Sequence, residues 1–240
     1  LIVETGAGAS YSHTHVTDEY LNLVNVNKAG QNNVNIAGKT VIANTAATLD
    51  QHASLRSIVE TGAGASYSHT HVTDDYADLV SNKAGTSNVH IVGKTVVVDP
   101  NTAAISVQNG VDLENVIKAN GSGSLTYNKL SDDADNLSAA RTASGQSAAI
   151  TGKTVQITGA TDLDKLATII TNTGNANLVS HSAVTDSYTD LTTKAGNQNV
   201  HIVNKTVIVN TAATLDQIAA LKNVVTANDT NGASFTHTHV

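Results

Sequence analysis

An unchanged repeat is the feature that most constrains the fold of this chain. Val3–Val16 (VETGAGASYSHTHV) recurs identically as Val59–Val72, an offset of 56 residues. The end of this segment, GASYSHTHV, returns in altered form as GASFTHTHV at Gly232–Val240. Self-similarity at a fixed period is the signature of repeat architectures, in which each unit packs on its neighbours. We therefore predict one solenoid over residues 1–240, with four tandem repeats at about 17–72, 73–130, 131–184 and 185–240 and the end of a preceding repeat at 1–16.

Two extended runs alternate with two helical runs in each unit. The first extended run is expected at Ser10–Val16, Ser66–Val72, Ser124–Leu130, Leu178–Val184 and Ser234–Val240. The second is expected at Val34–Ala43, Val89–Val98, Ala148–Ile157 and Val200–Val209. Strand-helix-strand order imposes parallel pairing through right-handed crossovers. The predicted fold class is α/β, a repeat solenoid of β-α-β-α units with parallel strands and flanking helices, and the pattern leaves open whether it contains one sheet or two.

Residues that favour helix starts follow the extended runs. The first helix of each unit is expected after the N-cap residues Thr17, Thr73, Ser131 and Thr185, with Asp18, Asp74, Asp132 and Asp186 in its first turn. The second helix is expected after Thr48, Asp112, Asp162 and Thr214, and Gln51 and Gln217 complete capping boxes. The last helix is predicted to turn Leu215, Ile218, Leu221 and Val225 inward. His52 shares the position of Leu166 and Ile218, so we expect it to be buried and neutral.

The composition narrows the classes of function. The chain has no Cys, Met or Trp and only 3% aromatic residues, so its core must consist of small aliphatic side chains in many thin layers. The net charge is -7 and the 13 basic residues are scattered, which argues against nucleic acid as a partner. No membrane span or charged-then-apolar leader is visible. The chain starts and stops in the same part of the unit, so we expect it to be a window of a longer array.

Histidines in the H-T-H runs suggest a metal site. Alternate residues of a strand share a face, so stacked imidazoles could bind a divalent metal. The candidate ligands are His13, His15, His69, His71, His237 and His239. The third copy has Tyr127 and Lys129 instead, and the fourth keeps only His181. A metal site would need its ligands in every copy, and these histidines are not kept in every repeat of the chain. The pattern therefore favours a packed or solvated strand face over a metal site.

A Gly-Lys-Thr triplet recurs at Gly38, Gly93 and Gly152, with Asn204 in place of Gly in the last copy. It resembles the end of a phosphate-binding loop, but the earlier glycine that such a loop needs is absent, and the triplet lies inside a predicted strand. We interpret it as a kink in that strand followed by a row of lysines.

The segments that connect the elements contain Asp, Asn and Gly, whose oxygen atoms could bind Ca²⁺. Ca²⁺ is therefore the one cofactor that we consider. Such a link contains Asn228, Asp229, Asn231 and Gly232, but neither an EF-hand loop nor the glycine-rich nonapeptide occurs. No Ser-His-Asp arrangement stands apart from the repeat, and catalysis needs one distinct pocket. We therefore do not expect an enzyme.

Phrases of the repeat resemble the tandem repeats of very large bacterial surface and secreted proteins. V-T-D-x-Y-x-D-L, at Val72–Leu79 and Val184–Leu191, is similar to their V-S-D-T-A-x-x-L units. N-T-A-A-T-L-D-Q-I-A-A-L, at Asn210–Leu221, is similar to their L-T-A-A-Q-x-x-A-L units. The resemblance implies an extracellular or cell-surface location, as a surface layer, fibre or adhesin, and it transfers no functional residues.

Two functions of different classes remain open after this reasoning. The first is a structural segment of an extracellular filament, surface layer or fibre that self-associates by end-to-end or lateral stacking. The second is an adhesin or binding module that uses the His/Tyr strand face or Ca²⁺-dependent links, with a cell-surface polysaccharide as its partner. The absence of a natural polar cap and of a unique pocket favours the first.

Overall fold

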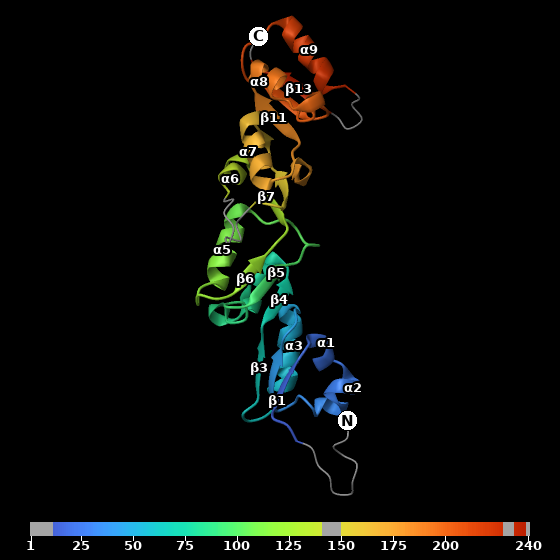
Figure 1. Ribbon diagram of the computed structural model, residues 1–240, viewed down its shortest axis with the longest axis vertical. Helices are drawn as coiled ribbons and strands as arrows, with labels where there is room; N and C mark the ends of the chain where they lie inside the picture. Colours follow the sequence, from blue (N-terminus) through green and yellow to red (C-terminus); the bar gives the residue numbers. More distant parts are fainter. Residues whose placement is uncertain (1–11, 141–149, 228–232, 239–240) are drawn as a thin grey trace. The chain divides into compact units, whose positions relative to one another are not determined.

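The computed structural model describes residues 12–140, 150–227 and 233–238. The chain divides into two compact units. The first contains the residues up to Thr102 together with Leu113–Tyr127, and the second contains Ala103–Asp112 and the residues from Asn128 onward. Each unit is α/β, with small all-parallel sheets alternating with helices (Figure 1). The prediction of an α/β fold with parallel strands is therefore confirmed.

Four separate sheets are formed by the described residues, two in each unit. In the first unit, β1 (His15–Asp18), β2 (Thr40–Ala43) and β3 (Ser66–His69) form one sheet, and β4 (His71–Asp74), β5 (Thr95–Val98) and β6 (Ser124–Thr126) form another. In the second unit, one sheet has the order β10 (Val179–Ser180), β8 (Thr154–Ile157), β7 (Lys129–Asp132). The other has the order β13 (Ser234–His237), β12 (Thr206–Val209), β11 (Ala183–Asp186), β9 (Ala160–Thr161).

Helices of two lengths accompany the strands. The long helices are α3 (Leu49–Val59), α5 (Val107–Ile117), α7 (Leu163–Thr173) and α9 (Leu215–Val225). The short α-helices are α1 (Tyr20–Leu23), α2 (Val26–Ala29), α4 (Tyr76–Leu79), α6 (Ala134–Ala139) and α8 (Tyr188–Thr193). Short 3₁₀ turns are η1 (Gln31–Asn33), η2 (Asn82–Ala84), η3 (Thr86–Asn88), η4 (Ala176–Leu178) and η5 (Asn197–Asn199). Among the described helices, none is both long and apolar enough to cross a bilayer.

The N-caps of the long helices match the sequence pattern in three cases. Thr48, Asp162 and Thr214 each accept a backbone N–H of the first turn, and the capping boxes with Gln51 and Gln217 are formed. The prediction at Asp112 is wrong, because α5 already begins at Val107, where the Ser106 hydroxyl accepts the Asn109 N–H at 3.1 Å.

The predicted caps of the short helices are also wrong. Thr17, Thr73, Ser131 and Thr185 lie inside strands β1, β4, β7 and β11. The ladder of parallel pairs continues through the next residue, as in Thr73 with Val97 and Asp74 with Val98. Pairing with the central strand therefore outweighs the capping preference of threonine. The side chains that cap α4, α6 and α8 are those of Asp75, Asp133 and Ser187, whereas Glu19 at the start of α1 forms no side-chain cap bond.

The first extended run of the repeat is divided between two sheets. In the second copy, β3 pairs with β2 and β4 pairs with β5, and Thr70 separates them. The buried residues are Tyr67 and His69 before the break and Val72 and Asp74 after it. The alternation of buried and exposed side chains thus slips by one residue at Thr70. The expectation of one continuous strand over 66–72 is wrong for this reason.

The second extended run is a strand only in its last four residues. Asn32 and Asn33 adopt left-handed backbone (φ 56° and 57°), so the segment before β2 forms a turn. Equivalent pairs of left-handed residues occur at 87–88 and 198–199. Gly38 follows in the same turn with φ of 72°. The Gly-Lys-Thr triplet was predicted to lie inside a strand. Gly38 and Lys39 lie instead in the turn before β2, and only Thr40 belongs to the strand, as its first residue. Asn204, which replaces this glycine, keeps the left-handed conformation at φ 59°.

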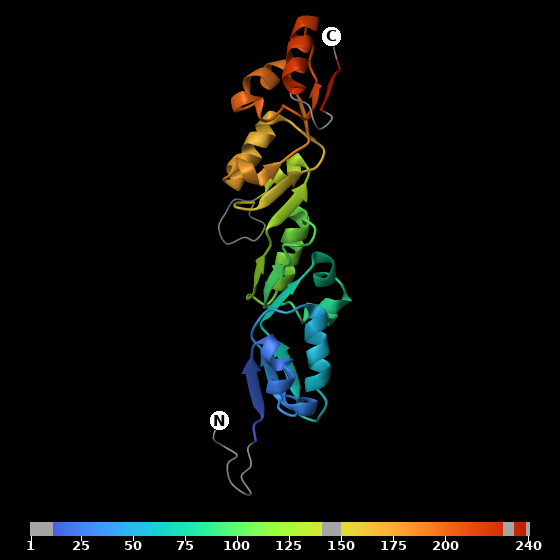
Figure 2. The same ribbon diagram turned by 90° about the vertical axis from the view of Figure 1, so that its right-hand side faces the viewer.

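Small aliphatic residues form the core that positions these elements. Helix α3 lies beside the sheet of β1, β2 and β3 (Figure 2). Its residues Leu55 and Val59 belong to one buried cluster with Val41 and Tyr67. In α9, Ile218, Leu221 and Val225 are buried as predicted. Leu215 was expected to turn inward with them, but 70% of it is exposed.

Candidate functional site

A regular polar arrangement recurs, in the part of the chain that the structure describes, where one repeat meets the next. We call it the seam: the N-terminus of a long helix, together with the strand that begins the following repeat. Single parallel bridges join Ala47 to Val72 and Ile105 to Leu130, and the short strand β9 pairs Thr161 with Val184 at the equivalent place. Within the described ranges, the seam therefore occurs three times.

A strand-final aspartate completes each seam. Asp74 Oδ2 accepts the Leu49 N–H, the first of α3, at 2.8 Å, and its Oδ1 accepts the Asp75 N–H at 3.0 Å. Equivalent bonds run from Val107 N–H to Asp132 at 3.0 Å and from Leu163 N–H to Asp186 at 2.9 Å. The first N–H groups of a helix have no partner inside the helix and carry partial positive charge. Each aspartate therefore stabilises the long helix of the preceding repeat.

Sequence reasoning missed this role, since it assigned these aspartates to the first turn of the following helix. Asp74 is 8% exposed, and burial raises its pKa, although the hydrogen bonds from Leu49 and Asp75 act in the opposite direction. The signal that could have revealed the role is the recurrence of Asp 23 to 25 residues after the first residues of α3, α5 and α7.

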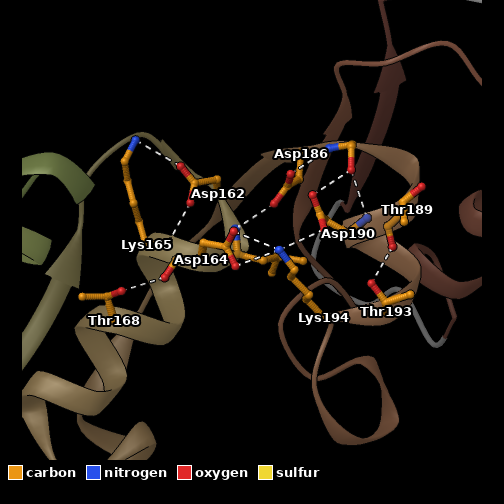
Figure 3. A network of polar contacts seen from close by, with 11 residues as sticks. Asp162, Asp164, Lys165, Thr168, Asp186, Thr189, Asp190, Thr193 and Lys194 are labelled. Carbon is orange, nitrogen blue, oxygen red and sulfur yellow. Dashed lines mark hydrogen bonds and ion pairs between the residues drawn. The ribbon is translucent and has the colours of Figure 1, made fainter.

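Lysines add an ionic contact across two of the seams. Lys83 Nζ lies 2.6 Å from Asp78 of its own repeat and 2.8 Å from Asp50 of α3. In the second unit, Lys194 Nζ lies between Asp190 and Asp164 of α7, at 3.0 and 2.9 Å (Figure 3). The carboxylates raise the pKa of both lysines. These pairs are exposed, so they select the register of neighbouring repeats more than they add stability.

The first histidine of the H-T-H run donates to a backbone carbonyl. His69 Nε2 lies 2.8 Å from the His90 oxygen, His13 Nε2 lies 2.6 Å from that of Asn35, and His181 Nε2 lies 3.0 Å from that of His201. A carbonyl oxygen only accepts, so Nε2 of each ring carries the hydrogen. The same nitrogen is thereby occupied and is not offered to a metal.

His69 also stacks on His52, with 4.0 Å between ring centroids and 14° between planes. The His52 ring bonds through Nδ1 to the Tyr67 hydroxyl at 2.6 Å and through Nε2 to the His71 oxygen at 2.9 Å. His52 and His69 are 1% and 2% exposed. Burial lowers the pKa of His52, and burial together with the adjacent His52 ring lowers the pKa of His69 to about 3. The expectation that His52 is buried is confirmed, and the direction of its pKa shift agrees with the expected neutral ring.

The rings of the remaining candidate histidines are not part of this stack. His15 and His71 each bond through Nδ1 to the hydroxyl of the preceding threonine, at 2.7 Å. His237 is exposed, and His239 lies outside the described residues. The proposed Ca²⁺ link with Asn228, Asp229, Asn231 and Gly232 also lies outside them. The metal hypotheses therefore stay predictions.

One acidic cluster has the spacing that a metal ion requires. Asp74, Asp75 and Asp78 offer ligand atoms within 4.8 Å of one another, and no other group of three such residues occurs in the described part of the chain. All three carboxylates already have partners: Asp74 at the seam, Asp75 on the Asp78 N–H at 2.7 Å, and Asp78 on Lys83. Capping and ion pairing thus account for the cluster.

No family model matches this chain, and neither a curated protein nor a solved structure does.

Proposed function

We propose that this chain is a structural repeat segment of an extracellular filament, surface layer or fibre, in which the repeats continue one after another as a solenoid. The observation that carries the proposal is the seam. The same bridge and the same aspartate-to-helix bond join successive repeats three times within the described residues. A contact that each repeat makes with the next is what an extended array needs, since every repeat then supports its neighbour.

The use of the polar side chains supports a structural role over a binding role. The alternative function, an adhesin or binding module, was expected to present the His/Tyr strand face to a ligand. In the second copy, Tyr67 and His69 are 7% and 2% exposed, so both are part of the core. The resemblance to the repeats of large bacterial surface and secreted proteins supports a location outside the cell.

Exposed valines at equivalent positions support contacts between neighbouring arrays. Val34, Val89 and Val200 follow the left-handed turns and are 61%, 55% and 58% exposed. Single exposed apolar residues are common, but one at the same position of several repeats is a regular contact point for lateral stacking.

Immunogold electron microscopy of the cells that produce the protein tests the proposal. Antibodies raised against the purified chain should label fibres or a lattice outside the cell. The matched control is the same antibody preincubated with the purified chain, which should remove the label. Label confined to the cell interior, or scattered over isolated molecules with no fibre or lattice, would contradict the proposal.

A further inference from the structure

Asparagine is followed directly by glycine at two places in the described ranges, Asn109–Gly110 and Asn120–Gly121. A third pair, Asn231–Gly232, lies outside the described residues. Glycine has no side chain to hinder its backbone nitrogen from approaching the amide of the preceding asparagine. The two described pairs have the same covalent chemistry, so the structure around each pair decides whether that approach occurs.

The pair Asn120–Gly121 lies in an exposed turn between α5 and β6. Asn120, Gly121 and Ser122 are all exposed. Asn120 Oδ1 accepts the Ser122 N–H at 3.1 Å and the Ser122 hydroxyl at 2.8 Å. This arrangement is an Asx turn, which folds the side-chain carbonyl back over the backbone of the next residue. Gly121 has φ of 79°, and a Cβ added there would meet nothing within 4 Å. The Asn120 amide and the Gly121 nitrogen therefore share one tight, open turn.

The hydrogen bonds of the turn favour attack by the Gly121 nitrogen on the Asn120 side-chain carbon Cγ. Two donors on Oδ1 withdraw electron density from Cγ and stabilise the negative charge that develops on the oxygen during attack. The Gly121 N–H donates to the Lys118 oxygen at 2.8 Å. That bond lies in the peptide plane, whereas the nitrogen attacks from a face of the plane, so the bond orients the nitrogen without blocking it.

We propose that Asn120 is a site of spontaneous deamidation, promoted by the two hydrogen bonds from Ser122, with water as the only co-reactant. The Gly121 nitrogen bonds to Cγ, the bond from Cγ to Nδ2 breaks, and ammonia leaves with the proton that the nitrogen gives up. Water then opens the resulting succinimide ring. Cleavage of the new bond to Cγ gives aspartate, and cleavage of the original main-chain bond gives isoaspartate, in which the chain runs through Cβ and Cγ. No group is oxidised or reduced.

Asn109 provides an internal comparison, because it lies in the first turn of α5. Asn109 is half-buried and Gly110 is buried, and the Gly110 N–H donates to the Ser106 oxygen at 3.1 Å. Helical backbone, with ψ of about −42°, holds a side-chain carbonyl carbon away from the next nitrogen. The helix must therefore open locally before this pair can react, and the free energy of that opening slows the reaction.

The modification should weaken the start of β6. Isoaspartate adds one methylene to the main chain just before Gly123, where space is restricted. A Cβ added at Gly123 would lie 2.9 Å from Ile117 Cγ2 and 3.0 Å from the Lys94 oxygen. The Ser124 N–H donates to that same oxygen at 3.0 Å, at the start of the pairing between β6 and β5. The added length must therefore be taken up at this pairing. A long-lived chain would accumulate the change with age.

Peptide mapping by mass spectrometry tests the inference on the purified 240-residue chain, incubated at neutral pH with and without guanidinium chloride. Deamidation adds about 1 Da, and chromatography separates the aspartate and isoaspartate forms. In native buffer, Asn120 should react at least about tenfold faster than Asn109, because only Asn109 requires local opening. In guanidinium chloride the two rates should become similar. Equal rates in native buffer, or a faster reaction at Asn109, would overturn the inference.

Substitutions test the role of the turn, with the folded state of each variant checked by circular dichroism. Ser122→Ala removes the hydroxyl donor and should slow deamidation of Asn120 about 2- to 10-fold, the effect of one ordinary hydrogen bond. Ser124→Ala, which removes an exposed hydroxyl two residues further on, is the matched control and should react like the wild type. An unchanged rate in Ser122→Ala would overturn the role assigned to Ser122.

Urea denaturation separates the effect of the added methylene from that of the new charge. Asn120→Asp has the charge of the product with a main chain of normal length. The isoaspartate form, isolated by chromatography, should therefore unfold at a lower urea concentration than this variant. Equal midpoints would refute the predicted weakening of β6.

Discussion

Acidification should destabilise the first unit through the buried pair His52 and His69. Both imidazoles lie in the core and both donate through Nε2 to backbone carbonyls, so a second proton on either ring would be buried. The pKa of each is lower in the folded protein than the ordinary 6.5. A group with a lowered basic pKa in the fold contributes stability that is fully present above pH 6.5 and is lost as the pH falls below it.

The magnitude follows from the pKa of His69, which is about 3. Each unit of difference between the folded and unfolded pKa corresponds to about 1.4 kcal/mol. At pH 5 the unfolded chain protonates His69 and the folded chain does not, so this residue alone should lower the free energy of unfolding by about 2 kcal/mol. The loss grows toward about 5 kcal/mol as the pH approaches 3, and His52 adds to it.

Urea denaturation followed by circular dichroism between pH 7.5 and 5 measures this effect. The variant His69→Tyr, which has the residue that Tyr127 supplies in the next repeat, should show a shallower dependence on pH than the wild type. Thr48→Ala removes a helix cap without removing an imidazole, so it should lower stability by about 1 kcal/mol and keep the wild-type slope. Equal pH slopes for the wild type and His69→Tyr would refute the argument.

Three further substitutions test other parts of the structure by the same urea assay. Asp74→Ala leaves two N–H groups at the seam without their acceptor and should lower the free energy of unfolding by about 2–4 kcal/mol. The control Asp18→Ala should lower it clearly less, and equal losses would argue against the seam. Gly123 has φ of 96°, and an added Cβ would lie 3.0 Å from the Lys94 and Ile117 carbonyl oxygens. Gly123→Ala should therefore cost more than Gly121→Ala, which has open space and should lose about 1–2 kcal/mol; the reverse order would contradict the geometry. Asn204→Gly should be nearly neutral and Asn204→Val should lose about 1–2 kcal/mol, and a stable valine variant would show that the left-handed turn is not required.

Local chemistry explains which parts of the fold could be predicted from the sequence. At the start of α3, α7 and α9, a Thr or Asp side chain accepts the backbone N–H of the residue three positions later. This bond is local, so the Thr or Asp at the cap position was a sufficient signal in the sequence. Parallel pairing followed from the order of strands and helices, which leaves little choice of topology.

The strand boundaries depend on distant partners and could not be read locally. A threonine followed by aspartate suits both a helix cap and the end of a strand, and the register of β4 on β5 decides between them. The run from Val34 has the apolar character of a strand, yet Asn32 and Asn33 adopt left-handed backbone before it. Asparagine tolerates that conformation but does not impose it, so the turn was not visible.

The candidate site was partly hidden for a similar reason. His52 could be placed in the core because other copies have leucine or isoleucine there. The environment of His69 could not be predicted, because the strict alternation assumed for the H-T-H run breaks at Thr70. The seam aspartates required knowledge of which helix they face, which is a contact between repeats.

The break at Thr70 has a mechanical consequence. A single residue separates the end of β3 in one sheet from the start of β4 in the next, so the backbone has almost no slack there. When β3 slides or peels from β2, the displacement must pass directly to β4 and load its pairs with β5. We therefore expect the two sheets of the first unit to unfold together under tension. The force required should be set by the weaker of the two adjacent ladders, β2–β3 and β4–β5.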